Sequence, residues 1–504
     1  MAYEVKINIS VRELESSCNS PDLSQEVCFQ IGESEYLDLS YVEEQLLSCG
    51  FECFRAWLST YGTSEMLNES SREYQQNAWA MEREEGRRYQ VQGEVGRYEV
   101  QSFDVVYANG CRVPGGSRMF GELSPRALYQ TKGFEELSLF YGVCDLSYRK
   151  TQSLLERIAH QPGSVKLMSL QEQVDKEFAL YHQCLESKVE QILEDHHFEQ
   201  QAKPLEPQSA FASDAFQLEE KAVETVLEEM EFTAEENAIL LKNPVLYEDA
   251  EESVYICVDD VGVKEQTPHR QEALKEQDPK KDQPRRSVYQ TVAHLCFKGE
   301  SYLLNGSSLR WVLKMVVAFL LHNQRLHKRW IFLVDGQRTL YRSIEKYVAF
   351  KGHFTFILDW YHLEKKAKEL LSLALKGRAM RNATLEQILP LLWHGAVDQT
   401  ITSLENIDPQ QVKDLSKVKE FIGYLRRNRH AIPVYEIRKR LGMKNSSNVG
   451  EKANDRLVAS RQKHNGMSCS ENGSVALASI TAIKKNNEMQ KWLDDGDIDF
   501  KLAA

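Results

Sequence analysis

The clearest pattern of hydrophobic and polar positions lies between residues 328 and 366. Two short apolar runs, residues 330–334 and 354–358, flank a stretch with apolar residues at helical spacing, 339–350. Helical spacing returns from Leu363 onwards. Short apolar runs separated by one amphipathic helix are typical of a βαβ unit, in which helices cover parallel strands. The segment therefore predicts strand, helix, strand and helix, in that order.

The pattern before this unit predicts three further strands. The apolar run 254–258 ends on two adjacent acids, Asp259 and Asp260. Residues 287–297 and 301–304 are predicted to form two antiparallel strands. All of these strands would belong to one sheet, with the acidic pair at the end of its first strand.

The pattern after the unit is helical. Residues 384–441 show no strand pattern and predict a helical subdomain inserted into the core. The polar residues 445–448 could cap a helix over 449–462, which would place Glu451 in its first turn. The fold class expected from these elements is an α/β core with an all-helical insertion.

The N-terminal part has a different character. The first ninety residues are mostly polar and predict helices, over 37–54 and 64–88. Residues 88–108 alternate between polar and apolar, with glycines at 93 and 96, and predict a β-hairpin. The core is therefore expected to follow a mainly helical region that contains one hairpin.

Residues 134–170 return to helical spacing, interrupted by the break His160-Gln-Pro-Gly163. Two helices around such a break could form a helix-turn-helix, whose second helix enters the major groove of DNA. A simple helical hairpin is the commoner outcome of this pattern. Arg149 and Lys150 are the candidate DNA contacts in this region.

The expected domain boundaries follow from these segments. They are a helical region 1–87, a hairpin and candidate helix-turn-helix region 88–195, a linker with an acidic helix 196–252, a first core part 253–376, the helical insertion 377–445, the last core helix region 446–484 and a C-terminal tail 485–504.

Charge is unevenly distributed along the chain. The net charge is −13, but residues 280–470 contain 34 Lys and Arg against 16 Asp and Glu. A basic region of this kind suits a polyanion such as DNA, although a charged block can also be only a solvated surface. The chain lacks a GxxxxGK[ST] motif, which argues against an ATP-driven machine.

Neither the cysteines nor the apolar runs suggest export or a membrane. The ten cysteines are scattered without zinc-site spacing, and the start of the chain shows no secretory signal. The longest apolar run, 311–321, is interrupted by Lys314 and is too short to span a bilayer. We expect a cytoplasmic protein.

Three carboxylates arrive from separate elements of the predicted core. Asp259 and Asp335 each follow an apolar run, and Glu451 begins the late helix. Carboxylates are the ligands that Mg²⁺ prefers, and a few of them can hold ions for displacement at phosphorus. Acids after strands are also common as turn formers and helix caps, so each residue alone would be weak support. The pattern as a whole favours a metal site.

The neighbourhoods of these acids resemble a known family. Gly336 follows Asp335, and the next strand is followed by Asp359-x-x-His362. The runs SSNVGE (446–451), RQK (461–463) and GMSCS (466–470) are similar to a Gly-Ser-Gly-x-x-Glu and Gly-Met-x-Trp-Ser pattern. This arrangement resembles the Mutator-like DDE transposases of bacterial insertion sequences. The likeness extends from about Arg88 to Ala482, with Ser446 and Asn448 in place of glycines and Cys469 in place of tryptophan.

The resemblance implies an RNase H-like catalytic domain and a DNA transposase. Such an enzyme would bind the terminal inverted repeats of its element, cleave DNA with Mg²⁺ (or Mn²⁺) and join the ends to target DNA, as a homodimer or higher oligomer. It would be associated with the nucleoid of a bacterium. The implied residues are the catalytic metal ligands Asp259, Asp335 and Glu451, the supporting Asp260, Asp359 and His362, and the DNA-binding Arg149, Lys150, Arg338, Arg461 and Lys463.

Some alternatives stay open at the level of sequence. Either Asp259 or Asp260 could be the first ligand, and Asp259 is preferred because it directly follows the apolar run. His362 could be structural or catalytic. The chain could also be a catalytically silent, domesticated transposase that only binds DNA, or an RNase H-like nuclease without strand transfer.

Overall fold

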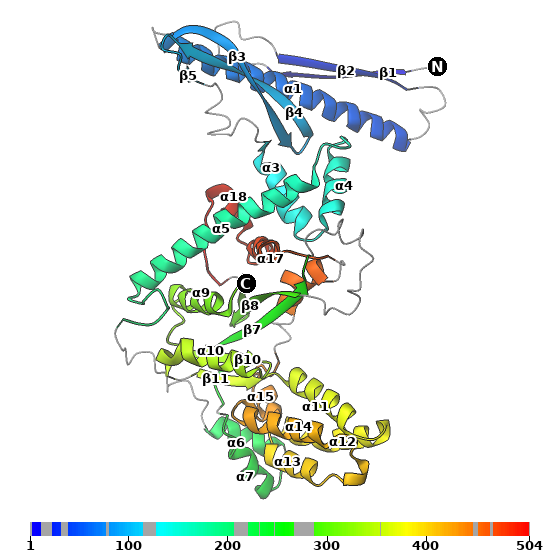
Figure 1. Cartoon of the computed structure of the whole chain (residues 1–504), viewed down its shortest axis with the longest axis vertical. Helices are drawn as coiled ribbons and strands as arrows, with labels where there is room; N and C mark the ends of the chain where they lie inside the picture. Colours follow the sequence, from blue (N-terminus) through cyan, green and yellow to red (C-terminus); the bar gives the residue numbers. More distant parts are fainter. Residues whose placement is uncertain are drawn as a thin grey trace, which may run out of the picture. The chain divides into compact units, whose positions relative to one another are not determined.

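The computed structural model describes the chain except for residues 1–2, 12–22, 32–38, 77–79, 114–127, 206–219, 231, 246, 267–286, 353, 447–451, 464–466 and 503–504. The fold is mixed α/β. The chain divides into two compact units, Met1–Lys176 and Glu177–Ala504, which are described separately (Figure 1).

The first unit contains more β-structure than the sequence suggests. Its elements are β1 (Tyr3–Val11), β2 (Leu23–Ile31), α1 (Leu39–Gln76), β3 (Ala80–Gly93), β4 (Gly96–Tyr107), β5 (Arg112–Val113), β6 (Tyr129–Gln130), α3 (Lys132–Glu135), the π-helix η1 (Glu136–Val143), α4 (Tyr148–Ile158) and the start of α5 (Leu167–Asp195). β1 and β2 pair antiparallel, and a second sheet has the order β5-β4-β3-β6.

The predicted hairpin is confirmed, but it begins earlier than expected. β3 pairs with β4 from Ala80 to Gly93, where the two-residue turn starts. The helix predicted over 64–88 was therefore wrong from Ala80 onwards. Charged side chains of this segment form ion pairs across the hairpin instead, such as Arg88 with Glu99 at 3.1 Å. Cross-strand partners and packing on α1 decide the conformation of such a polar segment, and local propensity does not.

Helices lie on both sides of the predicted break. Ser147 caps α4 by accepting a hydrogen bond from the backbone N–H of Lys150 (3.3 Å). After α4 the chain turns through His160 and Gly163, both with positive φ, before α5 begins. The two helices predicted around the break are thus present.

The second unit is built on a five-stranded sheet. Its strands are β7 (Ser253–Lys264), β8 (Ser287–Phe297), β9 (Glu300–Gly306), β10 (Arg329–Val334) and β11 (Phe354–Leu358), in the order β11-β10-β7-β8-β9. β7, β8 and β9 pair antiparallel, whereas β10 pairs parallel with both β7 and β11. The βαβ unit and the antiparallel pair predicted from the sequence are both confirmed.

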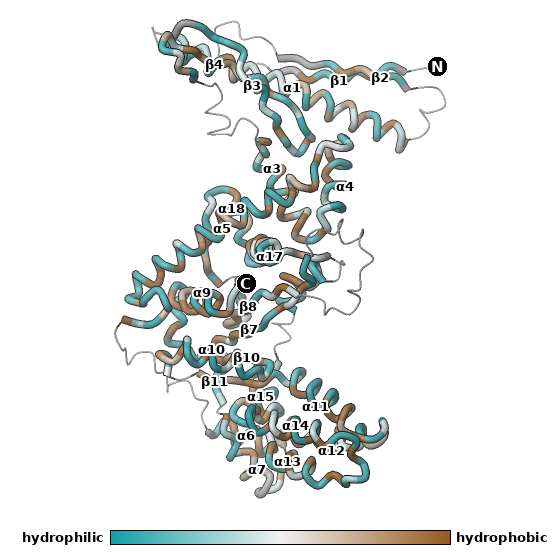
Figure 2. The backbone as a smooth tube through the Cα atoms, in the orientation of Figure 1, coloured by the Kyte–Doolittle hydropathy of each residue, from teal (hydrophilic) through white to brown (hydrophobic). Residues whose placement is uncertain are grey.

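Helices surround this sheet and extend from it. They are α6 (Glu220–Glu229), α7 (Ala234–Leu241), α9 (Leu309–His322), α10 (Arg338–Val348), α11 (Trp360–Ala374), α12 (Arg378–Trp393), α13 (Val397–Glu405), α14 (Leu415–Asn428), α15 (Tyr435–Arg440), the π-helix η9 (Asp455–Lys463), α17 (Glu471–Lys485) and α18 (Met489–Asp495). α9 is the most apolar of the helices next to the sheet, and nine of its residues are buried (Figure 2).

The first strand of the sheet is longer than expected. Its parallel pairing with β10 stops at Cys257, opposite Leu333. Its antiparallel pairing with β8 continues as far as Lys264, opposite Ser287. The prediction that the strand ends at residue 258 was therefore wrong, because β8 supplies hydrogen-bond partners well beyond the point where β10 ends. Asp259 lies inside β7, just after the parallel pairing stops.

The helical insertion is larger than residues 377–445. α6 and α7 come from the segment predicted as a linker with an acidic helix, yet they pack beside α15 (Figure 1). Val223, Leu227 and Leu240 form a buried cluster with Val434 and Ile437. Helices α6 and α7 therefore share a hydrophobic core with the helical insertion.

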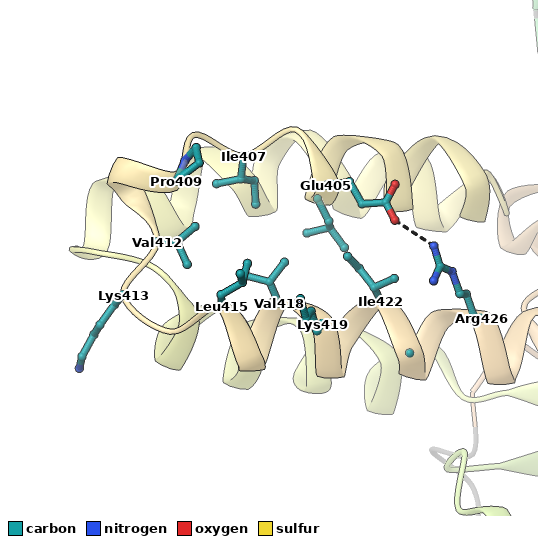
Figure 3. Close-up of a pocket in the computed structure, with 12 residues that line it drawn as sticks. Glu405, Ile407, Pro409, Val412, Lys413, Leu415, Val418, Lys419, Ile422 and Arg426 are labelled. Carbon is teal, nitrogen blue, oxygen red and sulfur yellow. Dashed lines mark hydrogen bonds and ion pairs between the residues drawn. The ribbon is translucent and has the colours of Figure 1, made fainter.

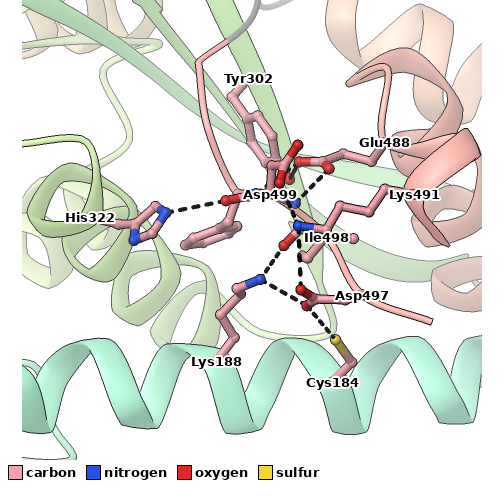
Figure 4. A network of polar contacts seen from close by, with 10 residues as sticks. Cys184, Lys188, Tyr302, His322, Glu488, Lys491, Asp497, Ile498 and Asp499 are labelled. Atoms are coloured by element: carbon pink, nitrogen blue, oxygen red, sulfur yellow. Dashed lines mark hydrogen bonds and ion pairs between the residues drawn. The ribbon is translucent and has the colours of Figure 1, made fainter. Parts of the chain in front are cut away.

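The residues after α18 are held on the core by polar contacts (Figure 4). The buried carboxylate of Glu488 accepts hydrogen bonds from the Tyr302 hydroxyl (3.1 Å) and from the backbone N–H of Asp499 (2.7 Å). Lys188 of α5 pairs with Asp497 at 2.8 Å. The predicted C-terminal tail thus packs on β9 and α5. Within the described ranges, no helix has the length and apolar character needed to cross a membrane.

Candidate active site

Asp259 lies on β7, the strand that pairs parallel with β10 on one side and antiparallel with β8 on the other. Its Oδ1 accepts a hydrogen bond from the backbone N–H of Asp260 (2.8 Å), and its Oδ2 accepts one from Nδ2 of Asn454 (2.7 Å). Burial and the neighbouring carboxylate of Asp335 raise the pKa of Asp259 to about 6, against a partly compensating effect of His362. The three side chains Asp259, Asp335 and His362 are therefore close enough to interact electrostatically.

Asp260 faces the other side of the sheet, because successive side chains on a strand alternate. Its Oδ1 accepts a hydrogen bond from the Thr291 hydroxyl on β8 (2.6 Å), and the residue is exposed. Val261 and Val263, which share the face of Asp259, pack against residues of η9 and α17. The geometry thus favours Asp259 over Asp260 as the acid of the candidate site.

Asp335 directly follows β10, the strand next to β7. Its Oδ1 accepts a hydrogen bond from the backbone N–H of Gln337 (2.9 Å). The hydroxyl of Tyr424, on α14 of the insertion, donates to the backbone carbonyl of Asp335 (3.2 Å). Burial, followed by the charge of Asp335, raises the pKa of Tyr424, so this hydroxyl stays protonated and keeps its role as a donor. The helical insertion therefore contacts the backbone of Asp335 directly.

Gly336 is required at this turn for two reasons. Its φ is +89°, which side-chain-bearing residues rarely adopt. A Cβ at this position would lie 2.6 Å from the Tyr424 hydroxyl oxygen and 3.0 Å from Cδ1 of Leu358. The Asp-Gly pair thus lets the insertion approach the backbone next to the acid.

We expect Gly336→Ala to destabilise the protein and to lower any activity of the site. The strained φ costs about 1–3 kcal/mol, and the clash with Tyr424 adds to this. Gly352→Ala is the matched control, because Gly352 also has a positive φ of 73° but no atom within 4 Å of the added Cβ. Urea-unfolding midpoints of the two variants measure the difference. Equal decreases of the two midpoints would show that the contact with Tyr424 does not require a glycine at position 336.

Asp359 and His362 stand at the start of α11, after β11. Asp359 is fully buried, and its Oδ1 caps the helix by accepting a hydrogen bond from the backbone N–H of His362 (2.9 Å). The same oxygen lies 3.4 Å from Nδ1 of His362. The His362 side chain is 28% exposed, so part of it is accessible to solvent. Asp359 and His362 thus lie beside each other at the start of α11.

Glu451 lies outside the described residues, so the structure does not test its place in the site. Asn454, three residues later in the chain, does reach Asp259. Sequence reasoning missed Asn454, since a single uncharged residue within a helical pattern gives no signal of its own. In the described part of the chain, no group of three or more His, Cys, Asp or Glu side chains is arranged to hold a metal ion.

The basic residues predicted to bind DNA differ in exposure. Arg149 and Lys150 are exposed on α4 of the first unit, and Arg338 and Lys463 are exposed in the second. Arg461 is only 1% exposed, and its guanidinium contacts the Met467 sulfur. This burial argues against a direct phosphate contact by Arg461, whereas the other four side chains are accessible.

A cavity of about 700 Å³ lies within the helical insertion (Figure 3). Apolar side chains of α13, α14 and their connection line most of it, including Ile407, Val418 and Ile422. An ion pair between Glu405 and Arg426 (2.9 Å) lies at one end. Since this lining offers few oxygen ligands and none of the acids described above, the cavity is not the candidate site.

Comparisons with protein-family models, with curated proteins and with solved structures find no match for this chain. Its function is therefore inferred from the geometry of its own residues.

Proposed function

We propose that this chain is a DDE-type DNA transposase with an RNase H-like catalytic core. It would cleave DNA at the terminal inverted repeats of its element and join the ends to target DNA, using Mg²⁺ or Mn²⁺. The observation that carries the proposal is the placement of Asp259 on β7 and of Asp335 directly after β10, the strand that pairs parallel with β7.

The sheet supports the RNase H-like part of the proposal. Three antiparallel strands, a helix, a parallel strand, a second helix and a further parallel strand follow one another, as the resemblance implies. The helical insertion comes after these strands and before the helix that follows Glu451. Chemistry in sheets with parallel strands is usually found beyond the carboxyl ends of those strands, where Asp335 and Asp359 lie.

The side chains at this edge fit a divalent cation. Asp259 and Asp335 are hard oxygen ligands of the kind that Mg²⁺ takes, and neighbouring carboxylates repel each other when no cation lies between them. Burial, and after it the charge of Asp335, raises the pKa of Asp259. When bound, the ion would stabilise the charge that develops on a phosphate during in-line displacement. Glu451 would be a further ligand.

The other residues of the site would orient the reacting groups. Asp359, 3.4 Å from Nδ1 of His362, would orient the ring of His362, which would contact the phosphate or move a proton there. Arg338, exposed on the first turn of α10, would neutralise a phosphate of the bound strand. Arg149 and Lys150 on α4 would contact DNA through the first unit, and two or more copies of the chain would hold the two ends of the element.

The proposal is tested with the DNA that flanks the gene. Labelled duplexes carrying its terminal inverted repeats are incubated with the purified chain, and nicks are mapped on sequencing gels. Cleavage at the repeat boundary supports the proposal. Binding without cleavage would indicate the silent DNA-binding alternative, and cleavage at random positions would indicate a nuclease.

Divalent ions should control this reaction. We expect cleavage with Mg²⁺ or Mn²⁺, whereas Ca²⁺ should support binding of the DNA but little or no chemistry. The measurement is the fraction of duplex cleaved at each ion concentration, with a gel shift run in parallel. Efficient cleavage in excess chelator would contradict the metal-dependent mechanism.

A further inference from the structure

Asn454 connects a late helical segment to the first acid of the sheet. Its Nδ2 donates a hydrogen bond to Oδ2 of Asp259 at 2.7 Å, across 195 residues of sequence. The other carboxylate oxygen of Asp259 accepts from the backbone N–H of Asp260. The carboxylate is therefore held at both oxygens, by two donors that come from different parts of the fold.

This arrangement leaves Asp259 able to act as a ligand. Each carboxylate oxygen has two lone pairs, and each accepts one of the hydrogen bonds described above. One lone pair per oxygen remains for another partner. A carboxylate with a fixed orientation loses less conformational entropy when it binds an ion than a freely rotating one does.

The segment that carries Asn454 is firmly anchored. Ala453, Leu457 and Val458 pack in a buried cluster against β7 residues such as Val261. Further along η9, the Gln462 side chain donates to the Ser474 backbone carbonyl (3.0 Å) and accepts from its hydroxyl (2.7 Å). The amide of Asn454 thus projects from a rigid support, which suits a residue that orients another.

We infer that Asn454 is a positioning residue of the carboxylate site, which fixes Asp259 for binding a divalent cation. The inference rests on the proposed function, because it takes Asp259 as a metal ligand. It also gives Asn454, which directly precedes η9, a task of its own: its amide contacts the carboxylate of Asp259. Partners of metal ligands typically contribute about 10–100-fold to metal affinity or activity.

The test measures Mn²⁺ binding to the full-length, metal-free chain in the absence of DNA. Free Mn²⁺ is followed by electron paramagnetic resonance during titration of the wild type, Asn454→Ala, Asn454→Leu and Asp259→Ala. Asn454→Leu nearly preserves the side-chain volume and removes only the polar contact. Lys452→Ala is the matched control, since Lys452 is exposed and lies two residues earlier in the same segment. Melting temperatures without Mn²⁺ report on folding.

We expect both Asn454 variants to bind Mn²⁺ about 10–100-fold more weakly than the wild type, with folding preserved. Asp259→Ala should lose the site, and Lys452→Ala should bind as the wild type does. Wild-type affinity in both Asn454 variants, with loss in Asp259→Ala, would overturn this inference and leave the proposed function intact. Absence of any Asp259-dependent Mn²⁺ binding in the wild type would overturn the proposed metal site itself. Unfolding of both Asn454 variants would also overturn the inference, because Asn454 would then be a structural residue.

Discussion

Replacing Asp335 with alanine is expected to abolish DNA cleavage while leaving binding to the DNA ends unchanged. Asp335 directly follows β10, the parallel neighbour of the strand that carries Asp259, and removing either carboxylate would take away one of the proposed ligands of the cation. Because the ion supplies several kcal/mol of transition-state stabilisation, the rate should fall by about 10³-fold or more. Asp259→Ala and Glu451→Gln should behave in the same way. Cleavage rates on labelled duplexes, with gel shifts for binding, measure the effect.

Asp260→Ala is the matched control for this series. Asp260 is adjacent to Asp259 but lies on the opposite face of β7, where it accepts a hydrogen bond from Thr291. We expect its loss to change the cleavage rate far less than the loss of Asp259. A wild-type rate for Asp335→Ala would show that Asp335 is not a ligand, and a lost rate only for Asp260→Ala would place the site on the other face.

The largest effect on stability is expected at the buried ion pair between Glu248 and Arg438. Both side chains are completely buried, and they meet through two contacts of 2.7 and 2.8 Å. Arg438 also donates to the Asn445 side chain (3.2 Å) and the Lys444 carbonyl (3.1 Å). The backbone carbonyl of Asn445 in turn accepts from the N–H of Trp360, next to Asp359. The ion pair is therefore connected, through Lys444 and Asn445, to the start of α11 at the candidate site.

We expect Glu248→Gln to destabilise the protein by about 3–5 kcal/mol, because it leaves the Arg438 charge buried without a counter-charge. The double variant Glu248→Leu with Arg438→Met should recover much of this loss, since no uncompensated charge then remains. Chemical unfolding followed by circular dichroism measures both.

An exposed ion pair of the same type provides the control. Asp398 and Arg429 also form a two-point contact, but their side chains are 67% and 53% exposed. Asp398→Asn should cost less than about 1 kcal/mol, because water screens surface pairs. If Glu248→Gln lowers the free energy of unfolding no more than Asp398→Asn does, burial does not make the Glu248–Arg438 pair more important for stability.

The parallel strands β10 and β11 could be predicted from sequence because they are short apolar runs on either side of an amphipathic helix. This order is typical of a βαβ unit, and Asp335 and Asp359 mark the ends of the two strands. The helical insertion was likewise visible in its spacing. These features depend only on local pattern, which is why β10, α10, β11 and α11 were found correctly.

Other features depend on partners that no local pattern contains. The length of β7 is set by β8, and the end of α1 is set by the pairing of β3 with β4. Arg461 was predicted to bind DNA from the family resemblance, and the structure buries its side chain. Asn454 was missed because its importance lies in one contact with a residue far away in the sequence. Sequence alone does not contain these features, because tertiary contacts decide them.

Strand transfer is the measurement that tests the central claim most directly. Duplexes that end in the terminal inverted repeats flanking the gene are mixed with a supercoiled plasmid, the full-length chain and Mg²⁺, and the joints are sequenced. The account predicts that 3′ ends become covalently joined to plasmid DNA with short target duplications, and that Asp259→Ala and Asp335→Ala form no joints. Duplexes that are bound or cut by the wild type but never joined to the plasmid would contradict it.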